Sequence, residues 1–316
     1  MVRPTSFGFD EQTAVSNAFQ NKSDLTQSEI IARANNEFQQ AVTTLSMHGI
    51  EVVVFEDDTT PAKPNAVFPN NWLSTWPDGR VFLYPMATKS RRTERSDAIL
   101  SSLKTHFKVS DTIDLTDSER DQKYLESTGV IIFDHINKTA YACASVRCDE
   151  TLFNDHVTAL GYTPVLFHAY DEQGIPIYHT NVLMGVQTNT AVICLDAISN
   201  KDERRVVVES LTKTGREVIN ISHAQMNSFC GNVLELHNQS EECILAMSQT
   251  AYDNFTPEQR VRLSIDKTLV PIAVPTIEAI GGGSVRCMLA ELFLQQSYAP
   301  PIILSNKKVT DKLTYR

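Results

Sequence analysis

The stretch NVLMGVQTNTAVICLDA, residues 181–197, carries a pattern that the rest of the chain repeats. Two runs rich in apolar and β-branched residues flank the polar sequence QTNT, which is typical of two strands joined by a turn. Residues 201–215 follow with helical spacing, and REVINIS (216–222) then has the composition of a strand. The stretch therefore predicts a unit built from a hairpin, a helix and a third strand.

The same order returns in four other parts of the chain: residues 26–57, 70–115, 129–169 and 231–274. The copy at 26–57 lacks its hairpin. It begins directly with a helix, for which Thr26 and Glu29 form a capping box. The missing hairpin is SVRCMLAELFL (284–294), close to the end of the chain. A ring of such units would therefore close where the two ends of the chain meet.

The predicted hairpins start about 50 to 58 residues apart, a period typical of propellers and repeat arrays. The first residues of the hairpins are Asn71, Gly129, Asn181, Asn232 and Ser284. Five units that close on themselves leave no exposed sheet edge. We therefore predict an α/β fold, a five-bladed α/β propeller of pseudo-fivefold ββαβ-type repeats around a central channel. The alternative is an open α/β sheet whose units only look alike.

We expect residues 1–316 to form a single catalytic domain, closed by pairing of the C-terminal hairpin (about 281–316) with the N-terminal unit. The 42% apolar and 21% charged residues are typical of a globular protein. A net charge of −10 without a lysine–arginine block argues against nucleic-acid binding. No apolar run approaches the roughly 18 residues of a membrane span, and the N-terminus has no secretory h-region.

The six cysteines are scattered and form no CxxC pair. This spacing argues against a zinc site and a disulfide framework, so we expect a reducing, cytoplasmic location. In a ring, the polar residues at the hairpin starts converge at one end of the channel: Asn71, Glu126, His179, Asn181, Asn232 and Cys287. Cys287 and His179 are the only thiol–imidazole pair that this register brings together, and such a pair can supply an activated nucleophile. The alternative for Cys287 is an inert core cysteine, as we expect for Cys143, Cys194 and Cys243.

Five motifs then occur in a characteristic order: FPNNW, YLESTG, SVRCDE, IYHTNVLMGV and GGGSVRCML. Together with the opening MVRPTSFGF, they resemble the superfamily of guanidino-group-modifying enzymes, which includes amidinotransferases, arginine deiminases and dimethylargininases and has the pentein fold. Nearly the whole chain is similar to its citrulline-hydrolysing branch, the citrulline ureidases. Each motif alone is weak, but all five fall on the repeat register.

The resemblance implies a role for each site residue. Cys287 would be the nucleophile, His179 the general acid/base, and Glu126 the carboxylate that holds the substrate nitrogens. Arg91 and Arg147 match the arginines that bind the substrate α-carboxylate, for which a guanidinium fork is suited. Arg92 and Arg95 are sequence neighbours that compete with Arg91 for this role.

Two departures from the family bear on the substrate. Asn71 and Asn181 stand where arginine deiminases carry aspartates. This chain has FPNNW where arginine deiminases have FTRDP, and it has HTN where they have HLD. An amide suits a neutral ureido group, whose oxygen needs a donor and whose nitrogens need acceptors. A guanidinium would have only Glu126 as an anionic partner, and a poorly paired buried charge is costly. Both changes favour a citrulline-like substrate.

The sequence therefore predicts a cysteine hydrolase that converts citrulline to ornithine, carbon dioxide and ammonia through an S-carbamoyl enzyme, with no metal or organic cofactor. Its ligand would be a small ureido or guanidino amino acid. We expect no nucleic-acid partner and no membrane, and the sequence is compatible with a homo-oligomer. One alternative is a guanidino hydrolase or amidinotransferase acting on arginine or a derivative. Another is a non-catalytic pentein, like the ribosome anti-association factor, that uses the ring as a binding surface.

Overall fold

The computed structural model describes residues 1–57 and 60–297. In these residues the strands form four three-stranded sheets and one two-stranded sheet. In each three-stranded sheet an antiparallel hairpin comes first, and the third strand pairs in parallel with the second strand of that hairpin. The strands are β3 (Leu73–Thr75), β4 (Arg80–Leu83) and β5 (Asp111–Asp114); β6 (Ile132–Asp134), β7 (Thr139–Cys143) and β8 (Thr163–Phe167); β9 (Met184–Val186), β10 (Thr190–Ile193) and β11 (Glu217–Asn220); β12 (Leu234–His237), β13 (Cys243–Ser248) and β14 (Thr268–Ile272).

A helix connects the hairpin to the third strand in each of these sheets, as the repeat predicted. The main helices are α2 (Gln27–Met47), α4 (Asp97–His106), α6 (Glu150–Ala159), α8 (Lys201–Thr212), α10 (Gln249–Asn254) and α11 (Pro257–Leu263). Polar side chains cap their first turns, because the first N–H groups of a helix lack partners within it. The Thr26–Glu29 capping box forms as expected, and Asn200 likewise accepts from the first turn of α8.

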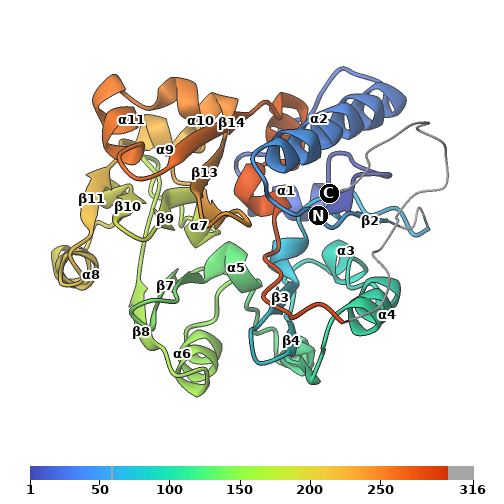
Figure 1. The fold of residues 1–316 in the computed structure, drawn as a ribbon, viewed down its shortest axis with the longest axis horizontal. Helices are drawn as coiled ribbons and strands as arrows, with labels where there is room; N and C mark the ends of the chain where they lie inside the picture. Colours follow the sequence, from blue (N-terminus) through green and yellow to red (C-terminus); the bar gives the residue numbers. More distant parts are fainter. Residues whose placement is uncertain (58–59, 298–316) are drawn as a thin grey trace.

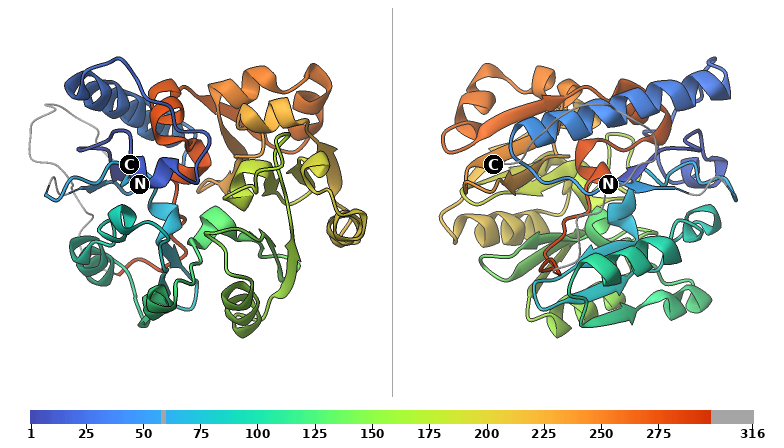
Figure 2. Two further views of the ribbon diagram at one scale, coloured as in Figure 1. Left: turned by 180° about the vertical axis from the view of Figure 1, so that it is seen from behind. Right: turned by 45° about the vertical axis from the view of Figure 1, so that its right-hand side comes forward.

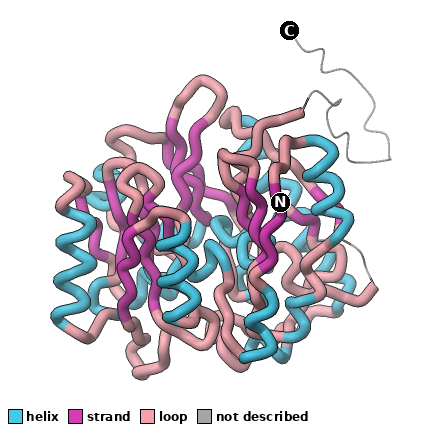
Figure 3. The backbone as a smooth tube through the Cα atoms, turned by 90° about the horizontal axis from the view of Figure 1, so that it is seen from below, coloured by secondary structure: helices cyan, strands magenta, loops and turns pink. Residues whose placement is uncertain are grey.

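The units follow one another around the molecule. In Figure 1 the chain passes from α2 to β3 and β4, then to α6, α8 and α11, and so returns to α2. The same succession is visible from behind and after a 45° turn in Figure 2. The strands form separate small groups and no continuous sheet in Figure 3. The structure thus shows a mixed α/β fold of repeated hairpin–helix–strand units. None of the helices in the described part of the chain combines the length and apolarity that a membrane span requires.

The apolar core is divided among the units, and its clusters join neighbouring units. One cluster links the third and fourth sheets through residues such as Val192 and Leu245. Another joins the two ends of the described chain, because it contains Phe7 and Phe38 together with Ile272 and Cys287. Residues far apart in the sequence therefore pack together where the first and last units meet.

Three expected elements differ from those in the structure. In the unit 70–115, the repeat predicts one helix between the hairpin and the third strand, over residues 91–107. The structure has two, α3 (Lys89–Arg92) and α4, because Ser96 caps α4 and begins it anew. In the expected strand 50–57, only β2 (Phe55–Glu56) is a strand; it pairs with β1 (Val2–Arg3). Proline has no backbone N–H to extend such a pairing, and Pro4 follows β1 directly.

The expected C-terminal hairpin is not formed within residues 281–297. These residues contain the turn η5 (Val285–Met288) and no strand, and the rest of the expected hairpin lies outside the described residues. Near its end the backbone of the segment forms an isolated antiparallel bridge between Gln296 and Phe107, and side chains bind it further upstream. Asn232 Oδ1 accepts from the backbone N–H of Arg286, and Thr75 Oγ1 accepts from that of Phe293.

Candidate active site

Short helical turns at the hairpin starts position most of the predicted site residues. Asn71 ends one turn, Glu126 and His179 are the N-cap residues of two others, and Cys287 lies in the fourth. The turns are η1 (Pro69–Asn71), α5 (Ser127–Val130), α7 (Thr180–Leu183) and η5. Turn α5 contacts η1 and α7, and η1 contacts η5. The fold therefore brings these side chains together from four different units.

A small cavity lies between these turns. It is lined by Thr13, Asn17, Asn65, Phe68, Asn71, Arg91, Arg147, Tyr178, His179, Gly281, Gly282, Gly283 and Cys287. The lining includes the predicted nucleophile, the predicted acid/base and both predicted arginines. Among the described residues it includes no aspartate and no glutamate. The walls are therefore polar, and the carboxylates that pair with the two arginines lie behind them.

Cys287 lies at the cavity wall and is 4% exposed. Two side-chain amides face its sulfur: Asn181 Nδ2 donates to Sγ at 3.5 Å, and Asn232 Nδ2 donates at 3.3 Å. Donors directed at a sulfur stabilise negative charge on it. The other cysteines lie in different surroundings, and burial raises the pKa of Cys143 and of Cys230 to about 12. Cys287 thus has the contacts that a thiolate nucleophile needs.

Asn232 was not among the predicted substrate-binding or catalytic residues, although the repeat register placed it at a hairpin start. Its Nδ2 also donates to the backbone oxygen of Asn181 at 3.0 Å, and its Oδ1 accepts from the backbone of Arg286 at 3.2 Å. One fully buried amide therefore connects two units and the turn that carries Cys287. The register was the signal for it, since the equivalent positions in other units are site residues.

Glu126 is fully buried and holds His179. The Nε2–H of His179 donates to Glu126 Oε2 at 2.8 Å, which assigns the tautomer. Arg147 Nη1 lies 3.3 Å and Arg91 Nη1 3.9 Å from the same oxygen. Burial alone would raise the pKa of Glu126, but Arg147, His179 and Arg91 together hold that pKa well below its usual range. Glu126 is therefore an anion at neutral pH.

Burial lowers the pKa of His179 to about 4, although the contact with Glu126 acts in the opposite direction. The charges of Arg147 and Arg91 lower this pKa further. His179 is therefore a neutral imidazole at pH 7. Because Nε2 is engaged by Glu126, Nδ1 is the ring nitrogen left to exchange protons with a substrate or with Cys287.

Of the three candidate arginines in the segment 91–95, only Arg91 lines the cavity. Its guanidinium binds Glu94 in a two-point ion pair, with distances of 2.9 and 2.8 Å. Arg92 and Arg95 instead pair with Glu119. Arg91 is therefore held rigidly in the wall of the cavity.

Arg147 is also fully buried, and the N-terminal segment holds it. Its Nη2 donates to Ser16 Oγ at 2.7 Å and to the backbone oxygen of Thr13 at 3.2 Å. Its guanidinium carbon lies 4.9 Å from the centre of the Tyr178 ring. These contacts orient the guanidinium while leaving it at the cavity wall. The sequence analysis did not identify Thr13, Ser16 or Tyr178, because polar residues in a loop give no signal without their partners.

The two predicted asparagines differ in their surroundings. The hydrogen-bond network assigns the Asn71 amide oxygen to Arg91, with distances of 2.7 and 3.2 Å, and its nitrogen to Asn70 Oδ1. Asn181 turns its nitrogen toward Cys287, while its buried Oδ1 has no hydrogen-bond partner among the described residues. Asn181 therefore lies directly beside the sulfur with an acceptor to offer, whereas Asn71 lies beside Arg91.

Gly129 makes room for this arrangement. A Cβ atom at this position would lie 2.4 Å from the Asn71 amide and 2.9 Å from the His179 ring. Such distances are impossible without displacing both side chains. Gly282, in the GGG stretch, has a φ of +63°, which a residue without a Cβ adopts at low cost. Gly129 is thus required by the side chains that surround it, and Gly282 is favoured by its backbone conformation.

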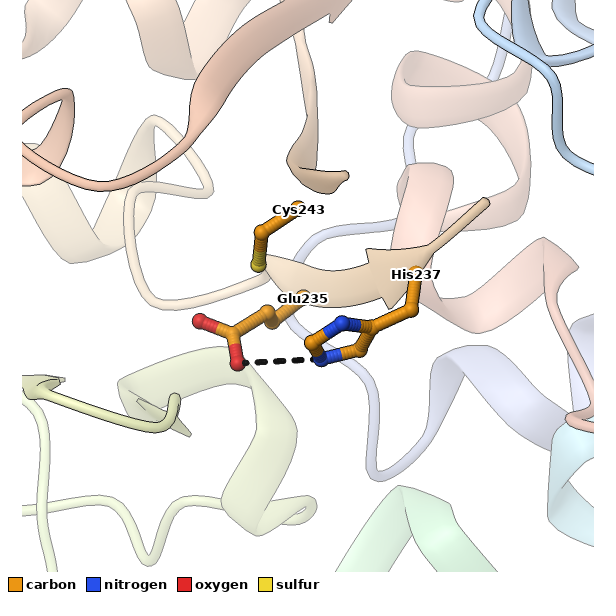
Figure 4. A group of neighbouring side chains, drawn as sticks. All are labelled: Glu235, His237 and Cys243. Carbon is orange, nitrogen blue, oxygen red and sulfur yellow. Dashed lines mark ion pairs between the residues drawn. The ribbon is translucent and has the colours of Figure 1, made fainter. Parts of the chain in front are cut away.

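Outside this cavity, one group of described residues could hold a metal ion. Glu235, His237 and Cys243 each offer a ligand atom, and these atoms lie within 4.8 Å of one another (Figure 4). Glu235 and His237 are two residues apart on β12, and Cys243 pairs with His237 across the hairpin. Glu235 also accepts from the backbone of Thr188 and lies 3.5 Å from Lys267, so its charge is already engaged. The group is separate from Cys287 and His179.

Comparison with known proteins gives the family of the chain and the solved structures that share its fold. The family described as N,N-dimethylarginine dimethylhydrolase, eukaryotic, matches residues 3–294. No curated protein matches the sequence. Among solved structures, ArgZ, an arginine dihydrolase from cyanobacteria, superposes with a TM-score of 0.71 at 16% identity. That comparison covers 96% of this chain but 41% of ArgZ, so this chain spans less than half of its length.

Two further structures are similar in fold. The N-terminal domain of ArgZ, as a cysteine-to-serine mutant bound to substrate, has a TM-score of 0.70 at 16% identity, covering 94% of this chain and 96% of that domain. The dimethylarginine hydrolase of Pseudomonas aeruginosa, complexed with citrulline, has a TM-score of 0.57 at 12% identity, covering 84% of this chain and 89% of that one. These neighbours share the fold of the guanidino-modifying pentein superfamily. The family match extends over nearly all the described residues, and the chain belongs to the N,N-dimethylarginine dimethylhydrolase family within that superfamily.

Proposed function

We propose that this protein is a cysteine-dependent hydrolase that cleaves the ureido group of citrulline to ornithine, carbon dioxide and ammonia. The observation that carries the proposal is the charge of the cavity. Two arginines line it, and no carboxylate among the described residues does. Glu126 is near, but its Oε2 already meets His179 and Arg147, and its Oε1 accepts from the backbone N–H of Ala87. Within the described residues, a guanidinium would therefore find no carboxylate in the cavity wall that is not already engaged, whereas a neutral ureido group needs none.

The rest of citrulline suits the same cavity. Its α-carboxylate is the anion that Arg91 and Arg147 can bind, because a guanidinium fork matches a carboxylate. Its ureido group has one acceptor oxygen and several N–H donors. Asn181 offers a free buried oxygen for one of those donors and lies beside the nucleophile. Asn71 would assist by fixing Arg91.

In the first half of the reaction, neutral His179 takes the proton of the Cys287 thiol. The thiolate attacks the ureido carbon, and the amides of Asn181 and Asn232 support the sulfur while it is charged. His179 then returns the proton to the departing ornithine nitrogen. The carbon–nitrogen bond breaks, and an S-carbamoyl enzyme remains. Glu126 stabilises the transient imidazolium, since it is an anion 2.8 Å from Nε2.

In the second half, His179 takes a proton from a water molecule that attacks the S-carbamoyl carbon. The bond from carbon to sulfur breaks, and the sulfur leaves as thiolate. The carbamate that is released decomposes to carbon dioxide and ammonia. Two steps through a covalent intermediate replace one difficult hydrolysis, which is the advantage of nucleophilic catalysis. The binding-module alternative leaves the Cys287–His179–Glu126 arrangement without a purpose.

A second candidate function is hydrolysis of a methylated or free arginine, which the family description favours. It requires the cavity to accept a cation beside Arg91 and Arg147. Glu126 would be the partner of that cation, as the nearest buried anion. The two candidates differ in the charge of the reacting group and so can be separated by substrate preference.

We further propose that the five units form one closed, five-bladed ring and a single domain. Four sheets repeat the same strand order, and the β1–β2 sheet belongs to the fifth unit. Packing of Phe7 and Phe38 against Ile272 supports closure at the ends of the described chain.

The experiment is a comparison of citrulline, arginine, N,N-dimethylarginine and agmatine as substrates of the full chain. Ornithine, ammonia and dimethylamine are measured, and Cys287→Ser serves as the blank. We expect ornithine and ammonia from citrulline at a kcat/KM at least tenfold above that for any guanidino compound. Preference for arginine or N,N-dimethylarginine would reject the citrulline assignment in favour of the second candidate. Equal rates in wild type and blank would reject both.

A further inference from the structure

A second cavity lies along the inner strands, beyond the turns that carry the catalytic residues. Its walls are the first strands of three successive sheets, β6, β9 and β12, together with the segment after η5. Cys287, His179 and Glu126 do not line it. Nothing in the proposed reaction uses this cavity.

Arg286 lines this second cavity, although the next residue, Cys287, faces the first. The side chain of Arg286 is 5% exposed, and its Nη1 has no hydrogen-bond partner. Within residues 1–57 and 60–297, its guanidinium forms neither an ion pair nor a hydrogen bond. Arginine keeps its charge in proteins, and a buried charge without a partner is costly. A cation in this state is suited to receive an anionic ligand.

Gln187 provides a second donor in the same cavity. It is 2% exposed, and its Oε1 accepts from Thr190 Oγ1 at 3.0 Å. Its Nε2 is buried and has no acceptor in the described part of the chain. Two buried groups that can only donate, one of them charged, therefore line one cavity. Their common complement is an acceptor with negative charge.

Within the described residues, none of the other charged groups of the cavity forms an ion pair with Arg286. Arg216 is bound to Asp134 through two contacts of 2.6 and 2.8 Å. Glu235 is engaged by Thr188 and Lys267. Glu291 also lines the cavity, but it forms no ion pair with Arg286 within the described residues. Burial raises the pKa of Glu291, and the charge of Arg286 acts in the opposite direction. The walls between these groups are apolar, with Ile132, Val186 and Phe293.

We propose that this second cavity is a binding site for a small organic carboxylate, held by Arg286 and Gln187, with its alkyl part against Ile132, Val186 and Phe293. The site is distinct from the catalytic cavity, although its arginine is adjacent to the nucleophile in the chain. The backbone N–H of Arg286 also donates to Asn232, which contacts the Cys287 sulfur. A ligand here would therefore be bound one residue from the catalytic turn.

Butyrate and its neutral isostere butyramide are suitable probes, with binding measured by ligand-observed NMR on the full chain. The matched pair of variants is Arg286→Met in this cavity and Arg147→Met in the catalytic cavity, where butyrate could also bind. We expect wild type and Arg147→Met to bind butyrate and not butyramide. Arg286→Met should weaken butyrate binding by about tenfold or more, the scale of one charge-assisted contact.

A second variant, Gln187→Met, should weaken butyrate binding without affecting the catalytic cavity. The melting temperature of Arg286→Met should be equal to or above that of wild type, because an unpaired buried cation is removed. The proposal is overturned if Arg147→Met does not bind butyrate, if butyramide binds equally well, or if both Arg286→Met and Gln187→Met retain the wild-type affinity. A marked loss of stability in Arg286→Met would show instead that this side chain serves the fold.

Discussion

Asn232 Nδ2 lies 3.3 Å from the sulfur of Cys287 and donates to it from a different unit of the fold. The same amide accepts from the backbone N–H of Arg286 through Oδ1, so its orientation is fixed from both ends. Asn181 adds a second donor to the sulfur at 3.5 Å. The sulfur of Cys287 thus accepts from two amides that the sequence separates from it by more than fifty residues.

We expect Asn232→Asp to lower kcat/KM for citrulline by about 10²-fold or more. The variant keeps an oxygen for the Arg286 N–H but replaces the donor at the sulfur with a carboxylate, and losing one oriented donor has consequences on this scale. Alkylation of Cys287 by iodoacetamide should slow in parallel. Asn254→Asp, on the exposed end of α10, is the control. Loss of stability with an unchanged alkylation rate would show that Asn232 only braces the fold.

Cys287→Ser should abolish turnover and leave the melting temperature close to that of wild type. Serine is nearly isosteric, so packing persists, but its hydroxyl is a far weaker nucleophile than a thiolate. Mass spectrometry after iodoacetamide treatment should find Cys287 modified first and protected by substrate. Burial raises the pKa of Cys243 to about 11, so this half-buried cysteine should react slowly. Turnover above a few per cent in Cys287→Ser would make this cysteine structural.

Asn71→Asp and Asn181→Asp test whether the amides reflect a neutral substrate. Asn181→Asp replaces a donor beside the sulfur with negative charge, so citrulline turnover should fall by about 10²-fold or more. Asn71→Asp should pair with Arg91 and reduce the positive charge of the cavity, so that arginine inhibits more strongly. Both effects are measured as citrulline turnover and arginine inhibition in wild type and each variant. Small, equal changes for both ligands would mean that the asparagines serve turn geometry alone.

The buried imidazole of His179 should make the folded state sensitive to acid. Its pKa is about 4 in the folded protein and near 6.5 in the unfolded chain, so the unfolded chain binds more protons between these values. The resulting stability is present above pH 6.5 and is lost as the pH falls toward 4. The pKa of Glu126 is depressed, so its contribution is lost only at more acid pH.

Urea unfolding of wild type and His179→Gln at pH 7 and pH 5 measures this contribution. From pH 7 to pH 5, wild type should lose about 2 kcal/mol more of its unfolding free energy than the variant. An equal loss in both proteins would mean that His179 is protonated, or solvated, in the folded state.

The repeated unit could be read from the sequence because it depends on local signals. Alternating apolar runs, polar turns and helix caps such as Thr26 and Asn200 act within a few residues, and the helices and sheets formed where these signals lie. The register of the hairpin starts also placed Cys287, His179, Glu126 and Asn71 near one another. The short β2 and the strandless segment 281–297 could not be predicted, because strand formation depends on a partner distant in the sequence.

The sequence by itself determined the order of the elements, the residue types at the hairpin starts and the cysteine with a histidine to activate it. Only the tertiary structure decided what those residues touch. It engaged Arg91 with Glu94, placed Arg147 against Ser16, and set Asn232 beside the sulfur. It also left Arg286 Nη1 without a hydrogen-bond partner among the described residues, in a second cavity. The physical reason is the distance along the sequence over which each effect acts. Propensity and capping act between neighbouring residues, whereas charge pairing and burial act between segments that only the completed fold brings together.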